Sequence, residues 1–205
     1  MQTHQNALFE EEPLAVMRLY GQGQVPLKSV AELVIAVDQI HRRIQAMDTF
    51  FILLKQGYSL PEQSTATDRL TTIVRAAESN LSLPQLKSVE LHSPGFWEVL
   101  GSITPLKFIT DCLHFWHERC KDKSYRNAAE ASKLFLENQL KANEVLKQRV
   151  ELMKSVGVTD DEIRQHFLNP VVGSVTTLYT ISQANVIDPQ SVQLKELPSL
   201  QAPNP

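Results

Sequence analysis

Two cysteines and two histidines lie close together in one stretch of the chain, where they might suggest a metal site. Cys112, His114, His117 and Cys120 carry the thiolate and imidazole groups that bind Zn²⁺ in proteins. Ligands that share one ion from a single helix must be three or four residues apart, which leaves only the pairs His114–His117 and His117–Cys120. No second histidine or cysteine pair has this spacing. We therefore expect no bound metal and no other cofactor, and we keep His114, His117 and Cys120 as weak metal candidates.

A second polar group surrounds His41. Asp38 lies three residues before His41 and four before Arg42, so the three side chains share one side of a predicted helix. Such a group can bind an anion, but an ordinary surface ion pair is the simpler interpretation. The chain contains no nucleophile elbow, P-loop, His-Glu-x-x-His run or carboxylate pair placed for acid–base catalysis. We lean towards a protein that is not an enzyme, and an unrecognised site around His41 or His114 remains the alternative.

The composition narrows the classes of protein to consider. Of the 205 residues, 42% are hydrophobic and 21% are charged, which is enough for a packed core and excludes a wholly disordered chain. The formal net charge of −3 gives no electrostatic basis for nucleic-acid binding. No stretch approaches the roughly 18 to 20 apolar residues of a membrane-spanning helix. The N-terminus lacks the pattern of a secretory signal, so we expect a cytoplasmic protein with reduced cysteines.

The N-terminal half combines predicted strands with one long amphipathic helix. The apolar run from Leu14 to Tyr20 ends at Gly21-Gln22-Gly23, which predicts a strand and a turn. Across 26–54, apolar residues recur every three or four positions, which predicts a helix. A shorter helix is expected over 68–78. Two further strands, joined by a turn at Ser93-Pro94-Gly95, are expected over 86–91 and 96–100.

The C-terminal half is predicted to be mainly helical. Thr104-Pro105 is a helix-start signal, and no glycine or proline follows before Gly157, so we expect one long helix over about 104–154. Thr159 and Glu162 have the spacing of a capping box, which predicts a short helix. The remaining expected elements are a helix that starts at Asn169-Pro170, an edge strand around 192–197 and a disordered tail over 198–205.

These elements predict an α+β fold that is predominantly helical, with a few short strands packed against about five helices. We divide the chain into an N-terminal α+β part over 1–100 and a second part over 101–197. In the second part, short helices pack on the long helix. Both parts are expected to belong to one domain.

The segment 103–117 is unusually apolar for a surface helix. Its polar side chains, among them Lys107, Asp111 and His114, form one narrow stripe, and a helix of this kind is normally buried between layers. Two alternatives are a docking face for a partner and contact with a membrane. Membrane contact is disfavoured because the stripe holds one lysine beside two acidic residues.

The predicted long helix supplies the leading hypothesis for function. Its heptad core rows hold too many polar residues for a dedicated coiled coil. If the helix is continuous, the short helices cannot cover its whole apolar side, and an interface is expected at Leu136, Leu140, Leu146 and Val150. We therefore expect a non-enzymatic interaction protein or assembly subunit, which binds a protein partner or itself, with a two-fold dimer favoured. The alternative is a small effector whose 103–116 segment engages a membrane or a partner on activation.

Overall fold

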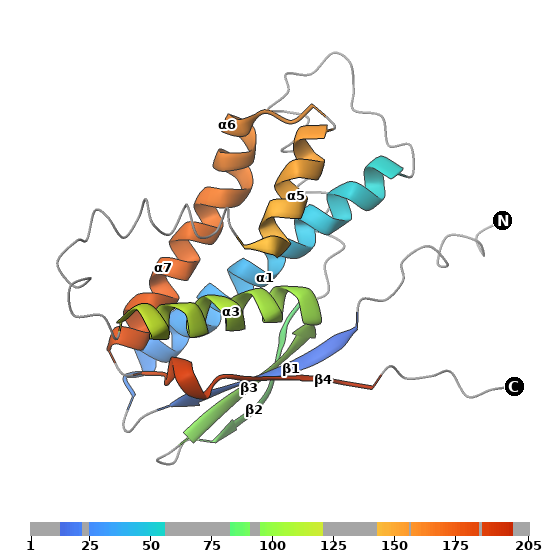
Figure 1. The fold of residues 1–205 in the computed structure, drawn as a ribbon. Coiled ribbons are helices and arrows are strands. Elements are labelled where there is room, and N and C mark those ends of the chain that lie inside the picture. The colour runs from blue at the N-terminus through green and yellow to red at the C-terminus, as the bar shows by residue number, and fades with distance from the viewer. Residues whose placement is uncertain are drawn as a thin grey trace, which may run out of the picture.

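The computed structural model places a four-stranded sheet beneath a layer of helices (Figure 1). It describes residues 13–21, 25–55, 83–90, 95–120, 143–155, 157–184 and 186–198. The strands are β1 (Leu14–Gly21), β2 (Gln85–Glu90), β3 (Gly95–Ser102) and β4 (Gln193–Glu196). The helices are α1 (Leu27–Lys55), α3 (Ile103–Cys120), α5 (Glu144–Ser155), α6 (Asp160–Ile163) and α7 (Asn169–Gln183), with the π-helical segment η2 (Arg164–Leu168) and the 3-10 turn η3 (Pro189–Ser191). The predicted α+β class is confirmed, and most of the described residues are helical.

The strand order is β2-β3-β1-β4, and every neighbouring pair is antiparallel. This is a split β-α-β arrangement, because β1 and β2 are connected through α1 and are separated in the sheet by β3. β4 comes from the C-terminal end of the chain and pairs with β1, so residues from both predicted parts of the chain share one sheet. The strands expected over 14–20, 86–91, 96–100 and near 192–197 are all present.

Side chains alternate along the two central strands, as the pleat of a sheet requires. Ala15, Met17 and Leu19 of β1 and Trp97 and Val99 of β3 are buried and belong to the same core as the helices. The core is completed by apolar side chains of α1, α3 and α7, among them Leu33, Val37, Ile40, Leu106, Ile109, Leu113, Val171, Val175 and Leu178.

The helix predicted over 26–54 is confirmed as α1. Pro26 lies immediately before it, where a missing N–H costs nothing, and the Pro26 carbonyl accepts hydrogen bonds from the backbone N–H groups of Ser29 and Val30. At 29 residues, α1 spans about 44 Å. It packs against α7 and α3 and reaches α5 near its C-terminal end.

The contact between α1 and β3 depends on a glycine. His41 of α1 is fully buried, and its Nε2 accepts a hydrogen bond from the backbone N–H of Ser102 at 3.2 Å. A Cβ atom at Gly101 would lie 2.6 Å from the same Nε2 atom, closer than a side chain can approach. One turn further along α1, Gln45 Nε2 donates a hydrogen bond to the hydroxyl of Ser102. A residue without a side chain at position 101 therefore lets the helix lie directly on the strand.

The single helix expected over 104–154 differs from the structure. α3 and α5 occupy its two ends and run in different directions (Figure 1). The Asn143 carbonyl accepts a hydrogen bond from the backbone N–H of Lys147, so Asn143 holds the N-cap position of α5. The lack of glycine and proline was therefore insufficient evidence for continuity, because asparagine is itself a strong helix-start residue. Residues 121–142 lie outside the described residues, as do the helix expected over 68–78 and the tail from 199 onward.

The two short helices expected after Gly157 are present, but they are joined into one helical run. The predicted capping box is confirmed: Thr159 accepts from the backbone N–H of Glu162, and the Glu162 carboxylate accepts from the backbone N–H of Thr159. The run then widens into η2, where the backbone N–H of Asn169 bonds to the carbonyl of Arg164. The π-helical turn lets the chain pass through Pro170, which has no N–H to donate, without a break.

We expect Gly101→Ala to lower the free energy of unfolding by about 1–3 kcal/mol, since the added methyl group must displace the buried imidazole of His41. Gly173→Ala is the matched control, because a Cβ atom at that helical position meets no other atom within 4 Å. It should be neutral or stabilise the protein by up to about 1 kcal/mol. Urea denaturation followed by circular dichroism measures both changes. Equal stability of the two variants would contradict the proposed role of Gly101.

Candidate functional site

The metal candidates lie on α3. His114 is exposed, and its Nε2 lies 3.1 Å from the Val192 carbonyl, so this ring is tied to the segment that precedes β4. His117 and Cys120 lie in the last turn of α3, and their side chains fall outside what the structure describes. Within the described part of the chain, no three His, Cys, Asp or Glu side chains come together as metal ligands. His114 is thus placed as a link between α3 and the C-terminal strand.

The apolar side chains of the 103–117 segment belong to the protein's own core. Leu106, Phe108, Ile109 and Leu113 are buried, whereas the predicted polar residues Lys107, Asp111 and His114 are exposed. Burial also raises the pKa of the Cys112 thiol, which keeps this thiol protonated and unreactive at neutral pH. None of the described helices has the length and apolar character needed to cross a membrane. Burial between layers, the leading interpretation of this segment, is confirmed.

The predicted interface residues do not form one exposed patch in the described structure. Leu146 is fully buried in the core, and Val150 is half-buried. Leu136 and Leu140 lie outside the described residues. α5 is held to α1 by an ion pair between Arg149 and Asp48 at 2.6 Å, so its inward side is occupied by the protein itself.

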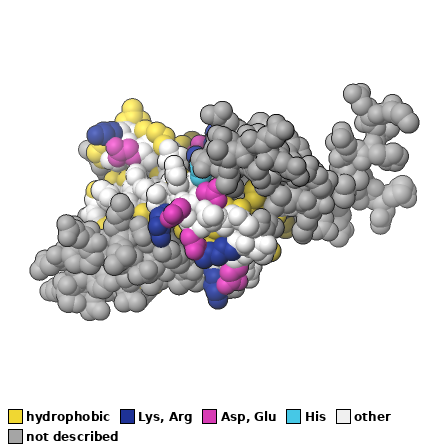
Figure 2. All heavy atoms as spheres, turned by 90° about the horizontal axis from the view of Figure 1, so that it is seen from above, with side chains coloured by type: hydrophobic (Ala, Val, Ile, Leu, Met, Phe, Trp, Pro, Cys, Tyr) yellow, Lys and Arg dark blue, Asp and Glu magenta, His cyan; other side chains and the backbone are white. Residues whose placement is uncertain are grey.

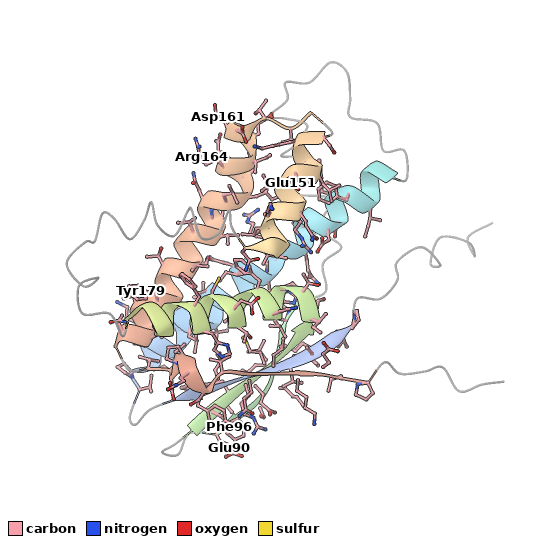
Figure 3. All side chains as sticks on the ribbon, viewed as in Figure 1. Glu90, Phe96, Glu151, Asp161, Arg164 and Tyr179 are labelled. Atoms are coloured by element: carbon pink, nitrogen blue, oxygen red, sulfur yellow. The ribbon has the colours of Figure 1, made fainter. Side chains whose placement is uncertain are left out.

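A cavity of about 400 Å³ lies between α5 and the α6–η2 run. Its floor is apolar and is formed by Val150, Ile163 and Leu168, while its rim carries Lys147, Glu151, Lys154, Asp160 and Arg164. Lys154 and Asp160 form an ion pair at 2.6 Å. Figure 3 labels Glu151, Asp161 and Arg164 on these neighbouring helices, and Figure 2 shows acidic and basic side chains interspersed on this side of the molecule. Because both positive and negative side chains surround the cavity, its charge favours neither anionic nor cationic ligands.

The polar group around His41 divides into a buried part and a surface part. Asp38 and Arg42 form an ion pair on the surface, with Arg42 Nε 2.8 Å from Asp38 Oδ2. The pKa of His41 is lowered to about 4, mainly because the ring is buried; the negative charge of Asp38 opposes this shift, and the positive charge of Arg42 contributes to it. His41 is therefore neutral at physiological pH. No described group accepts a hydrogen bond from its Nδ1, and the ring is fully buried.

The sheet surface that faces away from the helices carries a paired polar cluster. Arg18 of β1 forms an ion pair with Glu98 of β3, and Ser88 of β2 donates a hydrogen bond to the second Glu98 oxygen at 2.8 Å. The Arg18 guanidinium also lies 4.4 Å from the centre of the Phe96 ring, which Figure 3 shows at the far side of the sheet from the helices. These contacts connect three strands, and they occupy the charged groups with one another.

An exposed apolar face occurs on the N-terminal half of α1. Leu27, Val34 and Ile35 are 83%, 40% and 54% exposed, and Ala31 between them is also exposed. We call these four residues the α1 face. The helical periodicity over 26–54 did not single out this face. The available signal was that Leu27, Ala31 and Ile35, four residues apart, fall off the main apolar stripe.

α7 lies beside α1 and carries no charged residue along its 15 positions. The two helices are joined by a hydrogen bond from the Ser174 hydroxyl to Gln39 Oε1 at 2.8 Å. On its solvent side, Thr176 and Thr180 donate their hydroxyl protons to carbonyls four residues earlier in the same helix. Their polar groups are therefore already bonded, and this surface needs little dehydration to be covered.

The chain matches no protein-family model, no curated protein and no solved structure. Its function must therefore be inferred from the surfaces and side chains described above. The polar clusters described above are buried or paired within the molecule, whereas the α1 face is exposed. Exposed apolar side chains also lie on and just before the edge strand β2, at Leu83, Leu86 and Val89, but Leu27 of the α1 face is the most exposed of all the described large apolar side chains.

We expect the free energy of unfolding to fall as the pH is lowered from about 6.5 to about 4. In that window the unfolded chain protonates His41, whose unperturbed pKa is 6.5, but the native protein does not. The contribution approaches about 1.4 kcal/mol per pH unit and is absent above the window, where the ring is neutral in both states.

His41→Gln supplies the control, because glutamine retains an acceptor for the Ser102 N–H but does not titrate. Denaturation series at pH 7, 6 and 5 should show a shallower loss of stability for His41→Gln than for the wild type. Parallel curves for the two proteins would show that His41 titrates normally in the native state.

Proposed function

We propose that this chain is a non-enzymatic interaction protein, an assembly subunit whose contact surface is the α1 face. The supporting observation is the exposure of three large apolar side chains, Leu27, Val34 and Ile35, on one half of one helix. Single exposed apolar residues are common on protein surfaces, but a group of them marks a place where another molecule binds. Full burial of such a side chain is worth about 1.5–3 kcal/mol, so covering the exposed parts of Val34 and Ile35 is worth roughly half of that for each.

The charges around the α1 face have the arrangement of an interface rim. Lys28 and Glu32 lie 3.7 Å apart within its first turns, and the ion pair of Asp38 and Arg42 follows it in the next turn. Protein interfaces typically have an apolar centre and a polar, solvent-accessible border. α7 extends the surface on one side with uncharged side chains. A partner can therefore cover this region without stripping water from an unpaired charge.

This proposal places the contact surface on α1 and not on the 104–154 region. The apolar side of α3 is already used in the core, which removes the observation that motivated an effector with an exposed 103–116 segment. A catalytic role for His41 has no support in its surroundings, because the ring is buried and its Nε2 is bonded to the Ser102 N–H. Neither objection applies to the α1 face, whose side chains are exposed.

Ile35→Asp tests the proposal, since a carboxylate at the centre of an apolar contact must be dehydrated when the contact forms. We expect the variant to fold normally and to lose association, whether with another protein or with itself. Leu152→Asp is the matched control, because Leu152 on α5 is 50% exposed, close to the 54% of Ile35.

The measurement is native mass spectrometry of the full chain purified from its own cells, with wild type and both variants compared. Loss of a stoichiometric complex in Ile35→Asp and its retention in Leu152→Asp is the expected result. If Ile35→Asp forms the same species as the wild type, the α1 face is not the contact surface.

A further inference from the structure

We propose that the partner of the α1 face is a second copy of this chain, with the two α1 helices antiparallel across a two-fold axis. This inference rests on the proposed function and names its partner. It comes from four residues, Lys28, Ala31, Ile35 and Asp38, which we call the α1 stripe. Lys28, Ala31 and Ile35 are exposed and Asp38 is partly exposed.

The α1 stripe occupies the outermost side of the helix. Its members are three, four and three residues apart, which keeps them within a narrow sector of an α-helix with 3.6 residues per turn. That sector lies opposite the side on which Leu33, Ile40 and Ile44 enter the core. Spacing of this kind is what two helices use when they pack along each other at a small angle.

The spacing of the α1 stripe reads the same in both directions along the helix. In an antiparallel pair centred on position 33, residue 28 lies opposite residue 38 of the second copy, and residue 31 lies opposite residue 35. In each of the two outer layers Lys28 of one copy meets Asp38 of the other. These opposite charges approach each other beside the pairs that each chain already forms, Lys28 with Glu32 and Asp38 with Arg42. Each of the two inner layers joins Ala31 to Ile35, so a large side chain enters the space beside a small one.

Charge favours this arrangement over the alternatives. A parallel pair in the same register would place Lys28 against Lys28 and Asp38 against Asp38, and like charges in contact oppose association. A two-fold dimer requires a surface that is complementary to itself, and the pairing of Lys28 with Asp38 and of Ala31 with Ile35 meets this requirement. Leu27 and Val34 lie together on one flank of the stripe, where the second helix would cover them as well.

A charge exchange tests this register directly. Lys28→Asp and Asp38→Lys each replace two attractive layers with two repulsive ones, so each variant should raise the dimer dissociation constant by about tenfold or more. All chains are compared in a Glu32→Gln/Arg42→Gln background, because Lys28 and Asp38 pair with these two residues within each chain. There the double variant Lys28→Asp/Asp38→Lys restores opposite charges in both layers and should return to within a few-fold of the background chain. Sedimentation equilibrium of the purified full chain over a wide concentration range measures the constants, and circular dichroism checks that each variant folds.

Disulfide trapping tests the same register without charge changes. In a Cys112→Ser/Cys120→Ser background, chains carrying Ala31→Cys are mixed with chains carrying Ile35→Cys under mild oxidation. We expect the mixed covalent dimer to form several-fold faster than either homodimer, because only residues 31 and 35 lie opposite each other.

Several outcomes would overturn the dimer. A wild-type chain that stays monomeric at every concentration, a double variant as weak as the single ones, or equal trapping of all cysteine combinations would each do so. These failures differ from failure of the proposed function. If the wild-type chain does not dimerise but binds a different protein, and Ile35→Asp abolishes that binding, the α1 face is a contact surface but a second copy does not occupy it.

Discussion

The close approach of α1 to β3 is the constraint on which the rest of the molecule depends. The imidazole of His41 fills the space above Gly101 and accepts a hydrogen bond from the Ser102 N–H, and this contact fixes both the height and the rotation of α1 over the sheet. α7, α3 and α5 all pack against α1, so their positions depend on how α1 is placed on the sheet. The rotation that points His41 and Ile40 inward also points Ile35 and Ala31 outward. The candidate interface is therefore a consequence of how the helix is held.

The close contact between α1 and β3 buries a small group of polar atoms. His41 Nδ1 and Gln45 Oε1 have no hydrogen-bond partner among the described residues, although both side chains are buried. Buried polar groups that lack partners are costly, so the apolar contacts around them must supply the difference. The surrounding core includes Leu33, Val37 and Ile44 of the same helix. The free energy gained by apolar packing thus offsets the cost of a polar contact that determines how α1 lies on β3.

Local signals in the sequence were enough to locate the strands, α1 and the capping box at Thr159, because alternation, helical periodicity and capping act over a few residues. The relation between α3 and α5 required more, since the Asn143 start signal competes with a long stretch free of glycine and proline. The interface residues expected on that helix could not be judged from periodicity, as Leu146 shows by its place in the core. The α1 face was missed for a related reason: an apolar residue at a helical position does not reveal whether the protein itself covers it. The role of Gly101 could not be predicted from the sequence, because His41, which packs against it, lies 60 positions earlier in the chain.

The π-helical segment η2 determines which side of α7 meets α1. A π-helical turn holds one more residue than an α-helical turn, so every residue after it is rotated about the axis by about 100° relative to an uninterrupted helix. With this phase, Ser174 reaches Gln39 and the uncharged threonines face outward. Without the extra residue, the same fifteen positions would present a different set of side chains to α1. The segment 164–168 therefore sets the rotation of α7: the insertion or loss of one residue there would turn the helix by about 100° about its axis and so change which of its side chains face α1.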